Sequence, residues 1–524
     1  MAPQILRLPD GQSITVTPVF SGLFFKPNEL SAHPHAYPLG WTVVLNTQEG
    51  PPPADDKHDG HKRNENGANG LRYGILHTAE NAHPHLRPYT KPTLQNDNVF
   101  ISSISVPSSS ESKPPASPTR QIAMMLWITL YWYFHQQEPP PHLTTEASKH
   151  TPDEAKPRGD WRINIKRDGV LRSRNIIPKL ERMGLIASLD SSPSQAADDD
   201  AWDRMFVSKK MFWQIPGRLF LFSLQQKTLG ASVPGSPVGS RPGTPLSHLH
   251  SPLPHDHPND SRPEKFGFSV PTTTVMSPSV LPGPFHSSSH LPTYYPPPPL
   301  FYTTTNNIRH PLRPKPPRTG EVFYTRFIPS VGQYLSFRVA SPSPQAIPYQ
   351  GPTGPNPPSH PYLLTLSDTE LLRSWLSNPR VSKFWGSFTD GFLPTALSSQ
   401  HSFPAIGMWD GVPFGYFEIY WVKEDALGQK LGNEAGDWDR GLHVIVGEEW
   451  ARGRVSSWLS SLVHWCLTAD YRTMNVCLEP RVDNERFLQH LQSAGFSRER
   501  QIAFPHKQSW LVRMRREDWE GPAL

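Results

Sequence analysis

Cysteine is nearly absent from this chain of 524 residues. Its two cysteines, Cys466 and Cys477, lie inside apolar stretches, so we expect buried thiols rather than a disulfide or a cysteine-based metal site. The longest apolar run, residues 122–134, is shorter than the ~20 residues that cross a bilayer, and it predicts a buried helix. The beginning of the chain also lacks the basic and apolar regions of a secretory signal. We therefore expect a cytoplasmic protein with no membrane partner.

A strong charge imbalance is missing as well, because the formal net charge is +5 and basic residues are interspersed with acidic ones. Such a balance gives no global signature of nucleic-acid binding. Residues 173–189 nevertheless resemble the recognition half of a winged helix, with Arg172, Arg174, Lys179 and Arg182 on or beside them. A nucleic-acid-binding regulator is therefore an alternative. Because these basic residues are few and lie within an apolar fold, we expect no nucleic-acid partner.

Proline, by contrast, is abundant, and residues 228–318 are dominated by proline, serine, histidine and threonine. Such a segment buries too little apolar surface to offset its ordering entropy, so we predict a disordered linker. Shorter disordered loops are predicted at 50–70, 103–120 and 190–200. The histidines of the linker match no closed set of metal ligands, and no metal site is predicted. The linker divides the chain into an N-terminal domain, 1–227, and a C-terminal domain, 319–524.

Hydrophobic periodicity predicts a mixed α/β N-terminal domain, with strands at 13–17 and 41–46, a helix at 121–136, a helix and strand ending at 189, and a strand pair at 205–224. The C-terminal domain is predicted to be α+β. Its expected elements are a hairpin at 324–339, a helix at 366–376, a second hairpin through Asp410-Gly411, and strands and helices that alternate from 441 to 494 before two strands at 499–503 and 508–515.

A strand, a turn and a helix in the C-terminal domain carry the first candidate site. In strand 441–447 the apolar residues alternate, so His443 lies on the opposite face from Leu442 and Val444 and either lines a cleft or meets a polar partner. Arg452 and Arg454 lie in the turn that follows, where the N-terminus of the next helix favours an anion. The pattern predicts a phosphate-binding turn; two solvated surface arginines are the alternative.

The next strand ends in an acidic helix start, Glu479-Pro480-Arg481-Val482-Asp483-Asn484. Asp483 is placed to cap the helix that runs to Ala494. A capping carboxylate beside a cleft is also a candidate base, and the two roles are compatible. The sequence lacks the Gly-Lys-Ser/Thr of a nucleotide triphosphatase and the Gly-x-Gly-x-x-Gly of a dinucleotide fold, which argues against both classes.

The order of these elements resembles the Gcn5-related N-acetyltransferase fold, whose turn holds the coenzyme A pyrophosphate. Five separated motifs narrow the resemblance to the siderophore-biosynthesis acyltransferases, which include bacterial hydroxylysine and mycobactin enzymes and fungal hydroxyornithine acyltransferases. They are Asn378 to Gly386, Gly441-Leu442-His443, Arg452-Gly453, Glu479 to Asn484, and Phe504-Pro505-His506-Lys507. The resemblance covers about residues 320–520, and the fungal members imply a second, degenerate acetyltransferase-like domain at the N-terminus.

The resemblance implies transfer of an acyl group from coenzyme A to a hydroxylated side-chain nitrogen, with no metal. It implies His443 and Asp483 as the catalytic pair. The residues expected to bind the cofactor are Val446, Arg452, Gly453, Arg454 and Asn484. Those expected to bind the acceptor are Trp385, Glu418, His506 and Lys507.

The family suggests hydroxyornithine as acceptor and acetyl-coenzyme A as donor, in hydroxamate siderophore synthesis and iron homeostasis. Anhydromevalonyl-coenzyme A is the alternative donor. The relatives that use it are peroxisomal as far as the family suggests, and this C-terminus lacks a Ser-Lys-Leu address. A non-catalytic acetyltransferase-like scaffold is a further alternative, against which the presence of both His443 and Asp483 argues. A homodimer is compatible with the sequence.

Overall fold

The computed structural model describes residues 2–20, 22–28, 38–48, 86–105, 118–143, 145–173, 175–188, 205–221, 301–305 and 307–524. The segments predicted as disordered at 50–70 and 190–200, most of 103–120 and the linker up to residue 300 lie outside these residues. Within the described residues, no helix is long and apolar enough to cross a membrane.

An eight-stranded sheet forms the centre of the C-terminal domain, in the order β12-β13-β14-β15-β16-β17-β19-β18. The strands are β12 (Val322–Ile328), β13 (Gln333–Val339), β14 (Ser402–Trp409), β15 (Val412–Trp421), β16 (Arg440–Val446), β17 (Asn475–Leu478), β18 (Ser497–Ala503) and β19 (Gln508–Arg515). Neighbouring strands are antiparallel except β16 and β17, whose parallel pairing extends over two residue pairs. Beyond those pairs the two strands are no longer hydrogen-bonded, so the sheet opens at its centre.

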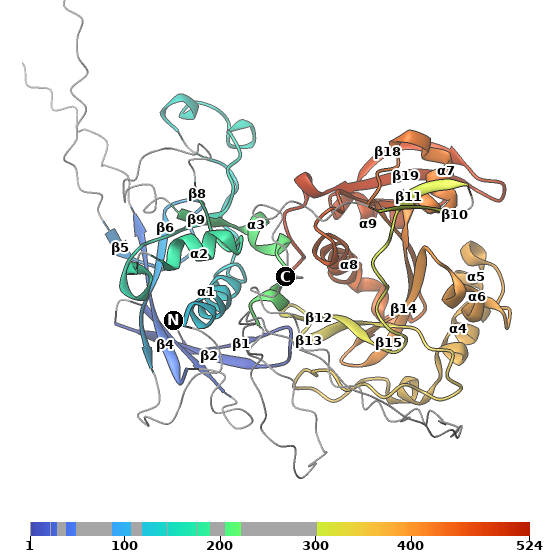
Figure 1. Ribbon diagram of the computed structural model, residues 1–524, viewed down its shortest axis with the longest axis horizontal. Coiled ribbons are helices and arrows are strands. Elements are labelled where there is room, and N and C mark those ends of the chain that lie inside the picture. Colours follow the sequence, from blue (N-terminus) through green and yellow to red (C-terminus); the bar gives the residue numbers. More distant parts are fainter. Residues whose placement is uncertain are drawn as a thin grey trace, which may run out of the picture. The chain divides into compact units, whose positions relative to one another are not determined.

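Helices cover both faces of this sheet (Figure 1). The long helix α8 (Val455–Ala469) packs its apolar side on the face that carries Phe417 and Leu442. The helices α4 (Asp368–Ser377), α5 (Pro379–Trp385) and α6 (Phe392–Ser398) share a core with Tyr416 and Ile445 on the other face. The helix α9 (Glu485–Ser493) follows β17, and the short helix α7 (Ala426–Leu431) follows β15. His443 therefore lies on the α4–α6 side, as the alternation of its strand predicts.

Local signals in the sequence account for these element ends. Ser367 and Glu370 form a reciprocal capping box at the start of α4. Asp410 and Gly411, both with positive φ, make the tight turn between β14 and β15, which matches the primed turns preferred in hairpins. Gly495, with φ of 92°, ends α9 in the left-handed conformation that glycine adopts without steric cost.

The N-terminal domain contains a second sheet with the same strand path. Its order is β1-β2-β3-β4-β6-β7-β9-β8, and its parallel pair, β6 with β7, occupies the same place in the order as β16 with β17. Its elements are β1 (Gln4–Arg7), β2 (Ser13–Val19), β3 (Gly22–Pro27), β4 (Gly40–Gln48), β5 (Leu86–Pro88), β6 (Asp97–Ser105), α1 (Pro118–Tyr133), β7 (Arg162–Ile165), α2 (Ile176–Arg182), β8 (Ala187–Ser188), β9 (Met205–Ser208) and α3 (Lys209–Gln214). The two halves of the chain therefore repeat one topology.

Among the described residues of the strand pair predicted at 205–224, only 205–208 form a strand, β9, and 209–214 form the helix α3 instead. Ser208 accepts a hydrogen bond from the backbone N–H of Met211 and so caps the helix. Phe212 and Trp213 are then buried on one side of it. The capping serine overrides the strand preference of the aromatic residues.

The end of the predicted linker is ordered, in contrast to the boundary expected at residue 318. Strands β10 (Tyr302–Thr305) and β11 (Ile308–Pro311) form a hairpin, and Arg313 follows it. The guanidinium of Arg313 binds both carboxylate oxygens of the buried Glu424, at 2.7 and 2.6 Å, and lies over the ring of Trp421. This clamp holds the segment to the residues that follow β15.

We expect the clamp to give different stabilities to two linker deletions that look alike in the sequence. Deleting residues 232–298 should leave a folded protein, because loop-closure entropy changes slowly with loop length. Extending the deletion to 316 removes both Arg313 and His310, whose Nδ1 lies 3.0 Å from Glu424 Oε1, and so leaves the buried carboxylate with an uncompensated charge, which costs about 3–5 kcal/mol. Replacing Arg313 by Ala keeps His310 beside Glu424 and should cost less. Urea unfolding of the three variants measures the difference. Equal stability of both deletions would show that the clamp contributes nothing.

Candidate active site

Three side chains on β15 and one on β16 form the base of the candidate site. Tyr416, Glu418 and Tyr420 alternate along β15, so they share one face of the strand. The antiparallel register places Glu418 directly opposite His443 on β16. The parallel pairs Arg440–Val476 and Gly441–Cys477 then bring the end of β17, and with it Glu479, level with the same histidine.

His443 is held between two carboxylates. Its Nδ1 lies 2.9 Å from Glu418 Oε2, and its Nε2 lies 2.6 Å from Glu479 Oε1. Each carboxylate also accepts a tyrosine hydroxyl: Tyr416 bonds Glu418 at 2.7 Å, and Tyr420 bonds Glu479 at 2.8 Å. We call this chain of five hydrogen-bonded residues, Tyr416-Glu418-His443-Glu479-Tyr420, the carboxylate–histidine network.

The network fixes the charges of its members. Burial opposes the charged form of His443, but the carboxylates of Glu479 and Glu418 outweigh it and raise the pKa of the imidazole well above its usual value. Burial likewise opposes ionisation of Glu479, yet His443 holds its pKa down at about 2. The pKa of Glu418 is lowered for the same reason. At neutral pH the network therefore holds an imidazolium between two carboxylates.

The opening between β16 and β17 lies beside this network. The indole Nε1 of Trp385, on α5, donates to the carbonyl of Val444 at 3.2 Å, which shows that this carbonyl faces the opened side of β16. Arg481, beyond the end of β17, donates to the carbonyl of Lys383 at 2.8 Å. These two bonds attach α5 to both sides of the opening, with the Trp385 ring 6.1 Å from that of His443.

The predicted phosphate turn contains two arginines with different surroundings. Arg452 is partly exposed and pairs with the exposed Glu449. Arg454 lies over the rings of Trp409 and Trp450 and bonds Gln333 at 2.7 Å, so its charge is directed into the fold. No side-chain hydrogen bond caps the N-terminus of α8, which follows directly on the 3-10 turn Glu449–Arg454 and has the polarity that favours an anion. A side chain at Gly453 would meet open space.

Asp483 is not the helix cap that the sequence predicts, because the N-cap of α9 is Asn484, whose side chain makes no capping bond. The carboxylate of Asp483 instead pairs with Arg481 through two bonds, at 2.9 and 2.6 Å. Both ring nitrogens of His443 are bonded to Glu418 and Glu479 rather than to Asp483. The catalytic roles that the family implies for His443 and Asp483 stay predictions.

Glu479 belongs to the motif Glu479 to Asn484, but the sequence alone predicts no role for it. The register of the sheet carries the signal for Glu479: His443 and Glu479 each lie two residues beyond the parallel pair Gly441–Cys477.

Lys507, at the tip of the β18–β19 hairpin, lies 3.4 Å from the carboxylate of Glu479. Its neighbour His506 is exposed. Val446 ends β16 opposite Gly415. The predicted acceptor residues Trp385, Glu418 and Lys507 are therefore gathered around the network.

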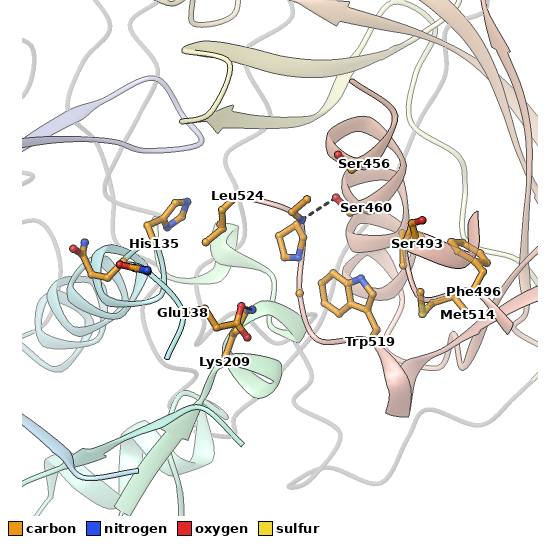
Figure 2. A pocket seen from close by; sticks show the side chains of 17 residues that line it. His135, Glu138, Lys209, Ser456, Ser460, Ser493, Phe496, Met514, Trp519 and Leu524 are labelled. Atoms are coloured by element: carbon orange, nitrogen blue, oxygen red, sulfur yellow. Dashed lines mark hydrogen bonds and ion pairs between the residues drawn. The ribbon is translucent and has the colours of Figure 1, made fainter. Parts of the chain in front are cut away.

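Two cavities of the described residues lie apart from this network. One, of about 560 Å³, is lined by Ser456 and Ser460 of α8, Trp519 and the C-terminal residues, together with His135, Glu138 and Lys209 (Figure 2). The other, of about 700 Å³, lies under the proline-rich segment between β13 and α4. Neither is lined by a member of the network, so the candidate site is the open sheet at His443 rather than either cavity.

Comparisons with known proteins give the family. Residues 365–504 match the acetyltransferase (GNAT) domain family. The chain is 56% identical to the N5-hydroxyornithine acetylase sidL of Beauveria bassiana, over 97% of this chain and 100% of that protein. The chain belongs to the N5-hydroxyornithine acetylase family.

Two further relatives share less of their length with this acetylase-family chain. The N(6)-hydroxylysine O-acetyltransferase of Escherichia coli is 38% identical over 39% of this chain and 59% of its own. The N(5)-hydroxyornithine:cis-anhydromevalonyl coenzyme A-N(5)-transacylase of Beauveria bassiana is 35% identical over 39% of this chain and 41% of its own. The resemblance inferred from the motifs is confirmed, whereas the roles of single residues stay predictions.

The charge state of the network can be measured directly. Because the pKa of His443 is raised on folding, its protonation stabilises the fold fully below the unfolded value of about 6.5, and this contribution is lost as pH rises through the folded pKa. We expect NMR titration to find the imidazole protonated at pH 7, and Glu479→Gln to lower its pKa. Glu449→Gln, which removes an exposed carboxylate outside the network, is the control. A neutral His443 at pH 7 would contradict the described charges.

Proposed function

We propose that this chain transfers an acetyl group from acetyl-coenzyme A to the side-chain hydroxylamine nitrogen of N5-hydroxyornithine. The observation that carries the proposal is the 56% identity to a hydroxyornithine acetylase over nearly the whole chain. The carboxylate–histidine network beside the open sheet supports it, because proton transfer must accompany attack of the nitrogen on the thioester. The product is a hydroxamate, and we place the reaction in siderophore synthesis and iron homeostasis, in the cytoplasm.

The share of this chain that each of two relatives matches favours acetyl over anhydromevalonyl as the transferred group. The acetylase matches this chain over its entire length, whereas the anhydromevalonyl transacylase matches 39% of it. The proposal for the donor site is that the uncapped start of α8, with Arg452 and Gly453, holds the pyrophosphate, and that Asn484 lies beside it. On this proposal the pantetheine arm passes through the opening between β16 and β17, and the acceptor approaches from the side of Trp385 and Lys507.

The hydroxyl group on the nitrogen should decide which acceptors react. The side-chain ammonium of ornithine resembles that of lysine, with a pKa of ~10.4, so only about one molecule in 2,500 is neutral at pH 7. A hydroxylamine is largely neutral there and attacks without first losing a proton. We expect kcat/KM for hydroxyornithine to exceed that for ornithine by at least ~100-fold at pH 7, measured by release of coenzyme A. Equal values would contradict the proposed acceptor.

The two arginines of the turn should behave differently on substitution. If Arg452 binds the pyrophosphate, Arg452→Ala removes a charge-assisted hydrogen bond worth about 1.5–3 kcal/mol and raises KM for acetyl-coenzyme A ~10-fold or more. Turnover should change little, because that bond is made equally in the ground and transition states. The matched variant Arg454→Ala should instead lower the melting temperature, since Arg454 packs on Trp409 and Trp450. An unchanged KM in Arg452→Ala would remove the turn from the donor site.

A further inference from the structure

Both ring nitrogens of His443 take part in hydrogen bonds within the network. As an imidazolium it donates from Nδ1 to Glu418 and from Nε2 to Glu479. A ring that already carries both protons has no lone pair with which to accept another. It also has no spare N–H with which to bind a substrate. For His443 to act as a base, it would first have to give a proton to one of its carboxylates and break that bond.

The two carboxylates differ in how open they are. The side chain of Glu479 is 4% exposed, and its oxygens contact His443, Tyr420 and Lys507. The side chain of Glu418 is 20% exposed, and its two oxygens each accept one bond, from Tyr416 and from His443. A carboxylate offers about four lone-pair positions. Glu418 is therefore the member of the pair that can accept a further bond from outside the network.

Glu418 also lies on the side from which the acceptor is proposed to approach. The ring of Trp385, which is bonded to the opened side of β16, lies 6.2 Å from Tyr416 and 6.1 Å from His443, the two residues that hold Glu418. Trp385 thus connects the two residues that hold Glu418 with the opening through which the donor is proposed to pass.

We infer that Glu418, and not His443, accepts the N–H proton as the hydroxylamine nitrogen attacks the thioester carbon. This inference rests on the proposed function. The new C–N bond forms, the C–S bond breaks, and the proton passes from nitrogen to the Glu418 carboxylate and then to the departing thiolate. The reaction yields the hydroxamate and free coenzyme A with no net uptake of protons. Glu479 and Tyr420 hold the imidazolium from behind and act as positioning residues.

The strength of this base suits the nitrogen that it serves. Attack places positive charge on nitrogen, and the hydroxyl group already makes that nitrogen less basic than an amine, so a weak base can remove the proton. His443 and Tyr416 lower the pKa of Glu418, whereas burial and the charge of Asp425 raise it. Glu418 is therefore ionised at neutral pH, while His443 is protonated and cannot accept.

Glu418→Gln distinguishes Glu418 from His443 as the base, because the two assignments predict opposite changes in activity. The glutamine can still accept from His443 and meet the hydroxyl of Tyr416, but it cannot take a proton. We expect kcat with hydroxyornithine to fall at least ~100-fold between pH 6 and 9, with KM for acetyl-coenzyme A nearly unchanged. If His443 were the base, losing a neighbouring carboxylate would lower its pKa and increase its neutral fraction. Activity at pH 7 would then be kept or raised, and that result overturns the inference.

Glu479→Gln is the matched control, because it removes the other carboxylate of His443 and the same charge. It should lose clearly less turnover than Glu418→Gln, since it leaves the proposed base in place. Equal losses in the two variants would overturn the assignment.

Tyr416→Phe covers the case in which Glu418→Gln does not fold. It removes the hydroxyl that stabilises the Glu418 carboxylate, so the acidic limb of the kcat profile should move to higher pH; an unmoved limb counts against Glu418. Wild-type enzyme assayed in parallel distinguishes failure of the Glu418 assignment from failure of the proposed function. An active wild type with an equally active Glu418→Gln variant leaves the function standing and removes Glu418, whereas an inactive wild type removes both.

Discussion

The imidazolium of His443, held between two carboxylates, is the interaction on which the site depends. It requires three strands in a fixed register: β15 supplies Glu418 opposite the histidine, β16 carries the histidine, and Glu479 follows directly after β17. A slip of one residue in either pairing would turn a carboxylate to the other face of the sheet, because side chains alternate with a period of two. The cores on both faces, which fix that register, therefore also fix the charge of the site.

The opening of the sheet follows from the same strands. If β17 continued alongside β16, its hydrogen bonds would occupy the edge at Val444, where the indole of Trp385 now binds. Pro480, directly after Glu479, has no N–H to donate to such a ladder. The proline thus ends the strand where the carboxylate is needed, and Arg481 then turns to α5. The site and the path proposed for the donor share one structural cause.

Local patterns were sufficient for most of the C-terminal fold. The alternation around His443, the hairpin at Asp410-Gly411 and the apolar stripe of α8 each have a period or a turn signal that a single segment reveals. The role of Glu479 needs the parallel register, which is a property of two strands 36 residues apart in their bonded pair. The prediction that Asp483 caps the helix is wrong because Arg481 binds its carboxylate. The clamp at Arg313 was hidden because its partner, Glu424, is distant in sequence and the segment around the arginine is rich in proline.

The N-terminal sheet repeats the strand order of the C-terminal sheet but carries different residues at the positions that match His443 and Glu479. Two residues beyond its last parallel pair stand Ile101 on β6 and Arg167 after β7, where the C-terminal sheet has His443 and Glu479. Ile101 is fully buried. An apolar side chain and a cation cannot rebuild an imidazolium between carboxylates. The fold alone therefore does not create the proton-handling network. The same strand order carries the network in the C-terminal sheet, where two positions hold the required charges. The matching positions of the N-terminal sheet hold other residues.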